Sequence, residues 1–99
     1  MKLKEIKRYH VFHYANDNRK ALYLMNENHV SENGKTHYLE WHRIYQDGRL
    51  RLQGTYTYEP DCNQNEVVDL GEFYDWMKKN HPIRYKRENW EASKPKEVL

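Results

Sequence analysis

Residues 37–58 read HYLEWHRIYQDGRLRLQGTYTY, two runs of alternating side chains joined by the dipeptide Asp47-Gly48. This dipeptide favours a two-residue type I′ turn, because both central positions of that turn need a positive φ. The resulting hairpin has the predicted cross-strand pairs Tyr45–Leu50, Arg43–Leu52, Trp41–Gly54, Leu39–Tyr56 and His37–Tyr58. Since strand residues alternate sides, these pairs share one apolar and aromatic face, and the opposite face is mostly polar.

Two further strands are expected before this hairpin, over Arg8–Ala15 and Ala21–Asn26. The residues between them, Asn16 to Arg19, have turn chemistry. Continuing the ladder backwards from the hairpin would place asparagines on the apolar face, so we expect a bulge or a loose loop between residues 27 and 35. An additional edge strand is expected over Ile83–Arg87.

A helix is expected to begin after Asp69, which has Glu72 three residues later at the spacing of a capping box. Its apolar stripe at helical spacing consists of Leu70, Phe73, Tyr74 and Met77. His81-Pro82 ends the helix, because the residue before proline disfavours the α region. We expect this stripe to cover the face of the sheet that carries Trp41.

These elements predict an α+β fold, a four-stranded antiparallel meander sheet with one C-terminal amphipathic helix packed on one face. We expect a single domain over residues 1–90. Residues 91–99 are polar and contain Pro95, so a flexible C-terminal tail is expected there.

Composition limits the class of protein. The 99 residues carry a formal net charge of +2, and aromatic residues make up 14% of the chain, which favours one small folded domain with an aromatic core. The single cysteine, Cys62, excludes an internal disulfide framework and favours a reducing compartment. We find no signal peptide and no bilayer-spanning run, and therefore expect a soluble cytoplasmic protein without a membrane partner.

Charge is unevenly distributed along the chain. The segment 59–75 contains acidic residues and no lysine or arginine, whereas residues 2–8 and 78–87 are basic. The acidic segment contributes Glu59, Asp61, Glu66 and Asp69 as candidate contact residues. An acidic surface of this kind imitates nucleic-acid phosphates, so it would suit an inhibitor that competes with nucleic acid for a protein.

The polar face of the hairpin is the second candidate contact surface. Its expected residues are Tyr38, His42, Arg51 and Gln53, and Trp90 near the tail is expected to be exposed as well. Tyrosine and histidine can stack on bases, and arginine can bind phosphate, so this face also suits single-stranded nucleic acid. The expected order of four strands and a helix is similar to that of the Pur and Whirly families of single-strand-binding proteins.

The loop before the helix resembles the calcium loop of EF-hand proteins. Asp61, Asn63, Asn65, Asp69 and Glu72 occupy positions 1, 3, 5, 9 and 12 of such a loop. The pattern departs from the family at position 6, where Glu66 replaces the glycine that makes the sharp turn, and the preceding segment has the pattern of a strand. The alternative interpretation is an acidic connecting loop with two helix-capping residues.

We expect no enzyme and no cofactor, because the sequence contains no nucleophile motif, metal-ligand spacing or phosphate-binding glycine loop. The expected function is a small non-catalytic protein-binding module, of the type of phage or mobile-element inhibitors (anti-CRISPR or immunity type) of nucleic-acid-processing enzymes. Aromatic residues and arginine would anchor the protein partner. Single-stranded nucleic-acid binding by the polar face is the alternative, calcium binding at 61–72 is the second alternative, and homodimer formation is a further expectation.

Overall fold

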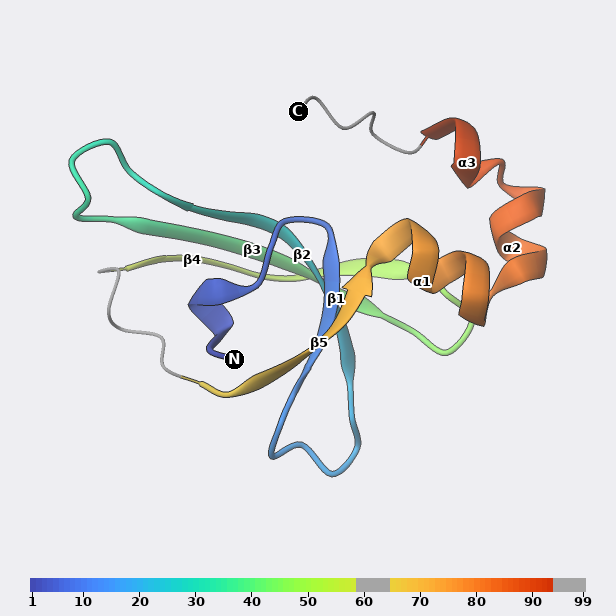
Figure 1. Ribbon diagram of the computed structural model, residues 1–99, viewed down its shortest axis with the longest axis horizontal. Helices are drawn as coiled ribbons and strands as arrows, with labels where there is room; N and C mark the ends of the chain where they lie inside the picture. The colour runs from blue at the N-terminus through green and yellow to red at the C-terminus, as the bar shows by residue number, and fades with distance from the viewer. Residues whose placement is uncertain (59–64, 94–99) are drawn as a thin grey trace.

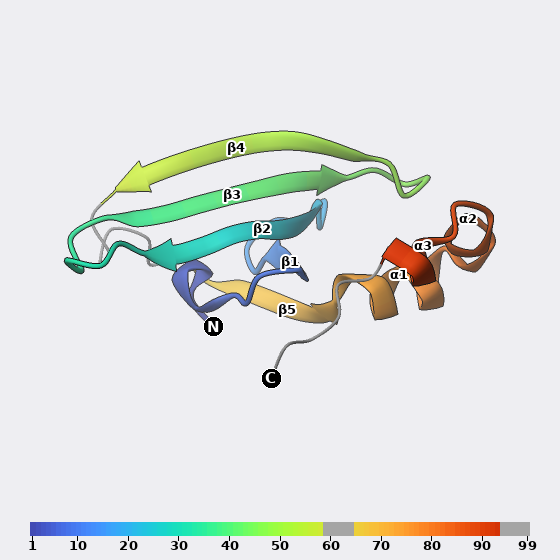
Figure 2. The same cartoon turned by 90° about the horizontal axis from the view of Figure 1, so that it is seen from above.

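The computed structural model describes residues 1–58 and 65–93, which form one antiparallel sheet and several short helices (Figure 1). The elements are η1 (Leu3–Glu5), β1 (His10–Tyr14), β2 (Leu22–Val30), β3 (His37–Ile44), β4 (Leu50–Tyr58), β5 (Val67–Glu72), α1 (Phe73–Asn80), α2 (Pro82–Arg87) and α3 (Trp90–Ser93). The strand order is β4-β3-β2-β1-β5. Figure 2 shows the strands in this order, with the helices beyond one end of the sheet. The predicted α+β class is therefore confirmed, with five strands in place of four.

The fifth strand, β5, changes where the helix begins. It pairs antiparallel with β1, so Asp69 lies in a strand and the expected start of the helix after Asp69 is wrong. Helix α1 begins at Phe73, and Glu72 is its N-cap. The Glu72 carboxylate accepts hydrogen bonds from the backbone N–H groups of Tyr74 and Asp75, at 3.0 and 2.9 Å. An N-cap residue has extended backbone angles, so one residue can end the strand and cap the helix.

The β3–β4 turn also differs from the expected one. Only Gly48 of the dipeptide has a positive φ, 86°. The Gly48 N–H donates to the carbonyl of Tyr45, and the Tyr45 N–H donates to the carbonyl of Arg49, both at 2.9 Å. This is a three-residue loop in which glycine supplies the left-handed position. The type I′ expectation was wrong because Asp47 stays at negative φ.

One extra turn residue shifts the register near the turn, and a β-bulge at Gln53 restores it. The expected pairs Tyr45–Leu50 and Arg43–Leu52 are replaced by Ile44–Leu50 and Arg43–Arg51. Beyond the bulge, the expected pairs Trp41–Gly54, Leu39–Tyr56 and His37–Tyr58 are confirmed. A bulge places two residues opposite one, so it absorbs the one-residue difference in loop length.

A second bulge lies in β2, at Asn26. It places Met25 opposite Trp41 and Glu27 opposite Glu40. Met25 is fully buried, and the Asn26 side chain donates to the Glu40 carboxylate instead of facing the core. An irregularity was expected between residues 27 and 35, to keep asparagines off the apolar face, and it occurs one residue earlier. It moves Asn26 away from Trp41, but Asn28 still lies opposite Leu39.

The sheet carries a core on each face. The η1-side core consists of Leu3, Ile6, Phe12, Met25, Leu39, Trp41 and Val67. The helix-side core consists of Val11, Leu24, Ile44, Phe73, Met77 and Tyr85. The helix therefore packs on the face opposite to Trp41, and the expectation that it covers the Trp41 face was wrong. In β1, and again in β2, two apolar residues follow each other in sequence, so one side chain lies on each face of the sheet. Both faces therefore need other elements to pack on them.

The C-terminal part is helical. Helix α1 ends at Asn80, as expected from the following His81-Pro82, but the segment expected as an edge strand is helix α2. Pro82 occupies its first turn, where the fixed φ and the missing N–H suit a helix start. Residues 94–99 of the expected tail lie outside the described residues. Within the part of the chain that the structure describes, no helix has the length and apolar character to cross a membrane.

Candidate functional site: a basic-aromatic groove

The residues expected on the polar face of the hairpin do not form one cluster. Tyr38 is exposed and stacks on His29, with 5.0 Å between ring centroids. His42 lies half-buried on the same face of β3. The shifted register pairs Arg51 with Arg43, so Arg51 lies on the opposite face from Tyr38 and His42. The expected cluster is therefore divided between the two faces.

Two other expected contact residues also lie elsewhere. Gln53 is the bulge residue of β4, and its side chain is outside the described residues. Trp90 is half-buried, with its ring centroid 5.4 Å from that of Phe73, so its expected exposure was wrong. It packs against the helix-side core.

The described part of the acidic segment is engaged within the chain. The Glu66 carboxylate lies 2.7 Å from the Lys2 ammonium and 3.1 Å from the N-terminal amine. Hydrogen bonds from Lys2 and from the N-terminal amine lower the pKa of Glu66. The Asp69 carboxylate lies 3.0 Å from Nδ1 of His10. These acids hold the N-terminal segment and β1 against β5.

The described part of the predicted calcium loop has an internal role as well. Asp69 accepts from the Gly71 N–H at 2.9 Å, Glu72 caps α1, and the carbonyl of Asn65 accepts from the Leu3 N–H. Among the described residues, no three His, Cys, Asp or Glu side chains lie close enough together to hold a metal ion. The remaining expected residues of the loop and of the acidic segment, Glu59, Asp61 and Asn63, lie outside the described residues.

A groove of about 860 Å³ lies at the end of the sheet, where the β1–β2 loop and the β3–β4 turn meet the end of α1. Figure 1 shows the β3–β4 turn beside this end of α1. The charged and aromatic residues that line it are Arg19, Lys20, Arg43, Tyr45, Asp47, Arg49, Trp76 and His81. We call this set the basic-aromatic groove. It combines four cationic side chains with one carboxylate.

The β1–β2 loop presents the first two cations. The Asp17 carboxylate accepts hydrogen bonds from the backbone N–H groups of Arg19 and Ala21, at 2.9 and 3.1 Å. These backbone hydrogen bonds lower the pKa of Asp17, so it is ionised at neutral pH. Through these two backbone hydrogen bonds, Asp17 fixes the conformation of the β1–β2 loop. Within the described chain, the side chains of Arg19 and Lys20 form no ion pair.

The β3–β4 turn is held in place by the helices. A Cβ at Gly48 would lie 3.0 Å from Cε of Met77 and 3.1 Å from Cδ of Arg84, so the turn packs directly on α1 and α2. The Arg84 guanidinium donates to the carbonyl of Asp47 at 3.2 Å. Asp47 in turn pairs with Arg49 at 2.7 Å. One wall of the basic-aromatic groove is therefore fixed relative to the helices.

Arg43 is the central cation of this region. Its guanidinium lies 5.7 Å from the ring centroid of Tyr23 and 5.9 Å from that of Tyr45. Its Nε is buried and has no hydrogen-bond partner among the described residues. Arg51 lies directly opposite on β4. Like charges directly opposite each other on neighbouring strands repel, and attraction between Arg43 and the Asp17 carboxylate offsets part of this repulsion; after the backbone hydrogen bonds, this attraction also contributes to the lowered pKa of Asp17.

Sequence reasoning missed the basic-aromatic groove because its residues come from three separated segments, 19–22, 43–49 and 76–81. The only local signal was the three arginines at 43, 49 and 51, which flank the turn. Their common location depends on the turn type and the bulge. Comparisons with protein-family models, with curated proteins and with solved structures find no match.

Proposed function

We propose that the basic-aromatic groove binds single-stranded nucleic acid. The observation that carries this proposal is the gathering of four cationic side chains, Arg19, Lys20, Arg43 and Arg49, in one groove that also contains Tyr45 and Trp76. Phosphate oxygens match the planar donor geometry of arginine.

The aromatic residues favour nucleic acid over a small inorganic anion. Tyr45 lies beside Arg43 and Arg49, with the Arg49 guanidinium 5.6 Å from its ring centroid. Trp76 contacts His81 on the α1 side of the same groove, at 5.5 Å between ring centroids. Bases that are not paired can stack on such rings, and each stacked base contributes about 1–3 kcal/mol.

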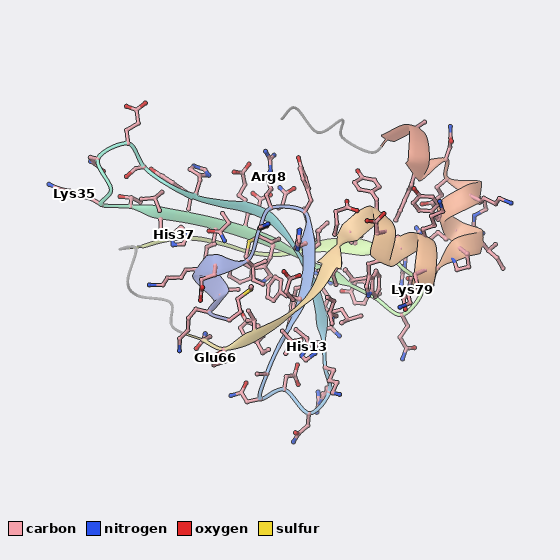
Figure 3. The ribbon with its side chains drawn as sticks, viewed as in Figure 1. Arg8, His13, Lys35, His37, Glu66 and Lys79 are labelled. Carbon is pink, nitrogen blue, oxygen red and sulfur yellow. The ribbon has the colours of Figure 1, made fainter. Side chains whose placement is uncertain are left out.

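The same geometry makes the protein-binding alternative weaker. That expectation was based on aromatic and arginine anchors and on an exposed acidic surface that would imitate phosphates. The described acids of the segment instead contact partners in the chain: Glu66 contacts Lys2, and Asp69 contacts His10. Figure 3 shows Glu66 beside η1, at the opposite side of the view from Lys79 on α1. A protein ligand remains an outcome of the test below.

Fluorescence anisotropy of labelled oligothymidine, oligouridine and duplex DNA tests the proposal at several salt concentrations. We expect single strands to bind more tightly than duplex, with an affinity that falls steeply as salt rises. Lys20→Gln removes one charge from the groove, and Lys35→Gln removes the same charge from the exposed β2–β3 loop, so these two variants are a matched pair.

Weaker binding by Lys20→Gln with unchanged binding by Lys35→Gln supports the groove as the site. Equal losses in both variants would indicate nonspecific attraction and would contradict it. If wild-type protein binds no oligonucleotide at low salt, the proposal fails, and capture of a protein ligand by the same groove becomes the next question.

A further inference from the structure

We infer that the bound strand continues from the basic-aromatic groove over the α1–α2 corner into a second hollow, which adds a phosphate contact at Arg87. This inference rests on the proposed function and specifies the length of its ligand. The second hollow has a volume of about 290 Å³ and is lined by residues 80–84 together with Arg87. Asn80 and His81 line both this hollow and the groove, so the two spaces border each other at the α1–α2 corner.

The second hollow offers an apolar surface and one available cation. Ile83 is 80% exposed, by far the most exposed of the large apolar side chains in the described residues, and lies next to Pro82. An apolar side chain of this kind can support the face of an unpaired base. Arg87 is exposed and has no ion pair within the described chain.

The neighbouring Arg84 has a different role. One of its terminal nitrogens lies 3.1 Å from the Glu88 carboxylate, and another donates to the carbonyl of Asp47. Arg84 therefore fixes the β3–β4 turn and the corner relative to each other, and Arg87 is the cation that remains to bind phosphate. The path runs from the β3–β4 turn, past His81, to Arg87.

A path of this kind requires a strand that fills both spaces. Single-strand-binding sites of about 4–16 nucleotides are typical of small domains. We therefore expect a long strand to use the groove and the second hollow, and a short strand to use the groove alone. The contribution of Arg87 should appear with the long strand and not with the short one.

Anisotropy with oligothymidines of about 4 and about 12 nucleotides tests this expectation. Arg87→Gln is compared with Lys86→Gln, which removes one charge from the same helix at a position outside the second hollow. We expect Arg87→Gln to weaken binding of the longer strand by about 3- to 10-fold and to leave the shorter strand within about twofold. Lys86→Gln should leave the affinity for both strands within about twofold.

Three results would overturn the inference, and they are distinguishable. If wild-type protein binds both lengths equally and Arg87→Gln changes neither, the strand stops at the groove, and the proposed function still stands. If Arg87→Gln and Lys86→Gln weaken binding of the longer strand equally, α2 contributes general electrostatic attraction and not a specific phosphate contact. If wild-type protein binds neither length, the proposed function itself fails.

Discussion

The described part of the acidic segment and the basic-aromatic groove are both charged regions, but their charges have different partners. Glu66 lies 2.7 Å from Lys2, and the carboxylate of Asp69 lies 3.0 Å from His10. By contrast, Arg19 and Arg43 form no ion pair within the described residues, although both line the groove. These acids stabilise the fold. In the groove, Arg49 is paired with Asp47, so Arg19, Lys20 and Arg43 are the cations available for a ligand.

This difference shows that a run of like charges in a sequence does not by itself indicate a binding surface. The acidic run appeared the better candidate because it is contiguous and lacks lysine and arginine. Glu66 and Asp69 contact the N-terminal amine and His10, which are distant in sequence, and Glu72 accepts from a backbone N–H two residues away. The groove gathers its cations from separate segments, and those cations lie beside aromatic rings.

The largest expected effect is a loss of stability of the sheet that carries both regions. Trp41 is 7% exposed and lies in the η1-side core, opposite Gly54. Trp41→Ala should lower the free energy of unfolding by about 3–5 kcal/mol, because a buried aromatic side chain is replaced by a cavity. Urea denaturation followed by circular dichroism measures this change. An unchanged unfolding midpoint would show that the sheet does not depend on this core.

The second effect concerns the groove alone. Arg19→Gln combined with Arg43→Gln should weaken oligothymidine binding by about 100-fold, because each guanidinium contributes a hydrogen bond to a charged group. The unfolding midpoint should change little, since neither side chain forms an ion pair among the described residues. Anisotropy and thermal denaturation measure the two quantities. An unchanged affinity would exclude Arg19 and Arg43 from the binding site.

The third effect concerns the acidic segment. Glu72→Ala removes the side-chain cap of α1 and should lower the free energy of unfolding by about 1 kcal/mol. The affinity for oligothymidine should stay within about twofold, measured where both proteins are folded. A large loss of affinity with intact folding would place Glu72 in a ligand site and remove the contrast between the two regions.

The smallest effect is a pH dependence at Glu66. Hydrogen bonds from Lys2 and the N-terminal amine lower its folded-state pKa below the ordinary value of 4.5. Its contribution to stability is therefore complete above pH 4.5 and is lost as the pH falls through the lowered value. Urea midpoints of wild type and Glu66→Gln should differ at pH 7 and converge at the acid end. A difference between the two urea midpoints that persists at low pH would contradict a stabilising role for the ion pairs of Glu66.

Local patterns were sufficient for much of the fold. The pairing of Trp41 with Gly54 followed from alternation, and the end of α1 followed from Pro82. The start of α1 was predicted wrongly because Asp69 and Glu72 both fit a cap, and only the pairing of β5 with β1 selects Glu72.

The candidate site was less accessible to sequence reasoning. Arg51 was predicted on the wrong face because a three-residue loop and the Gln53 bulge each move the register by one residue. The two register shifts cancel beyond the bulge, so the pairing of β3 with β4 differs from the expected one only between the bulge and the turn. Arg19, Arg43 and Trp76 line one groove because of the tertiary structure, and neither their spacing in the sequence nor their local pattern predicts it.

The most direct test of the central claim is the slope of log affinity against log salt concentration for oligothymidine, in three proteins. Wild type and Glu66→Gln should show the same steep negative slope. Arg19→Gln with Arg43→Gln should show a slope shallower by about 1.4, about 0.7 for each of two lost phosphate contacts. Equal slopes for the groove variant and wild type would contradict the claim that the cations of the basic-aromatic groove bind phosphate.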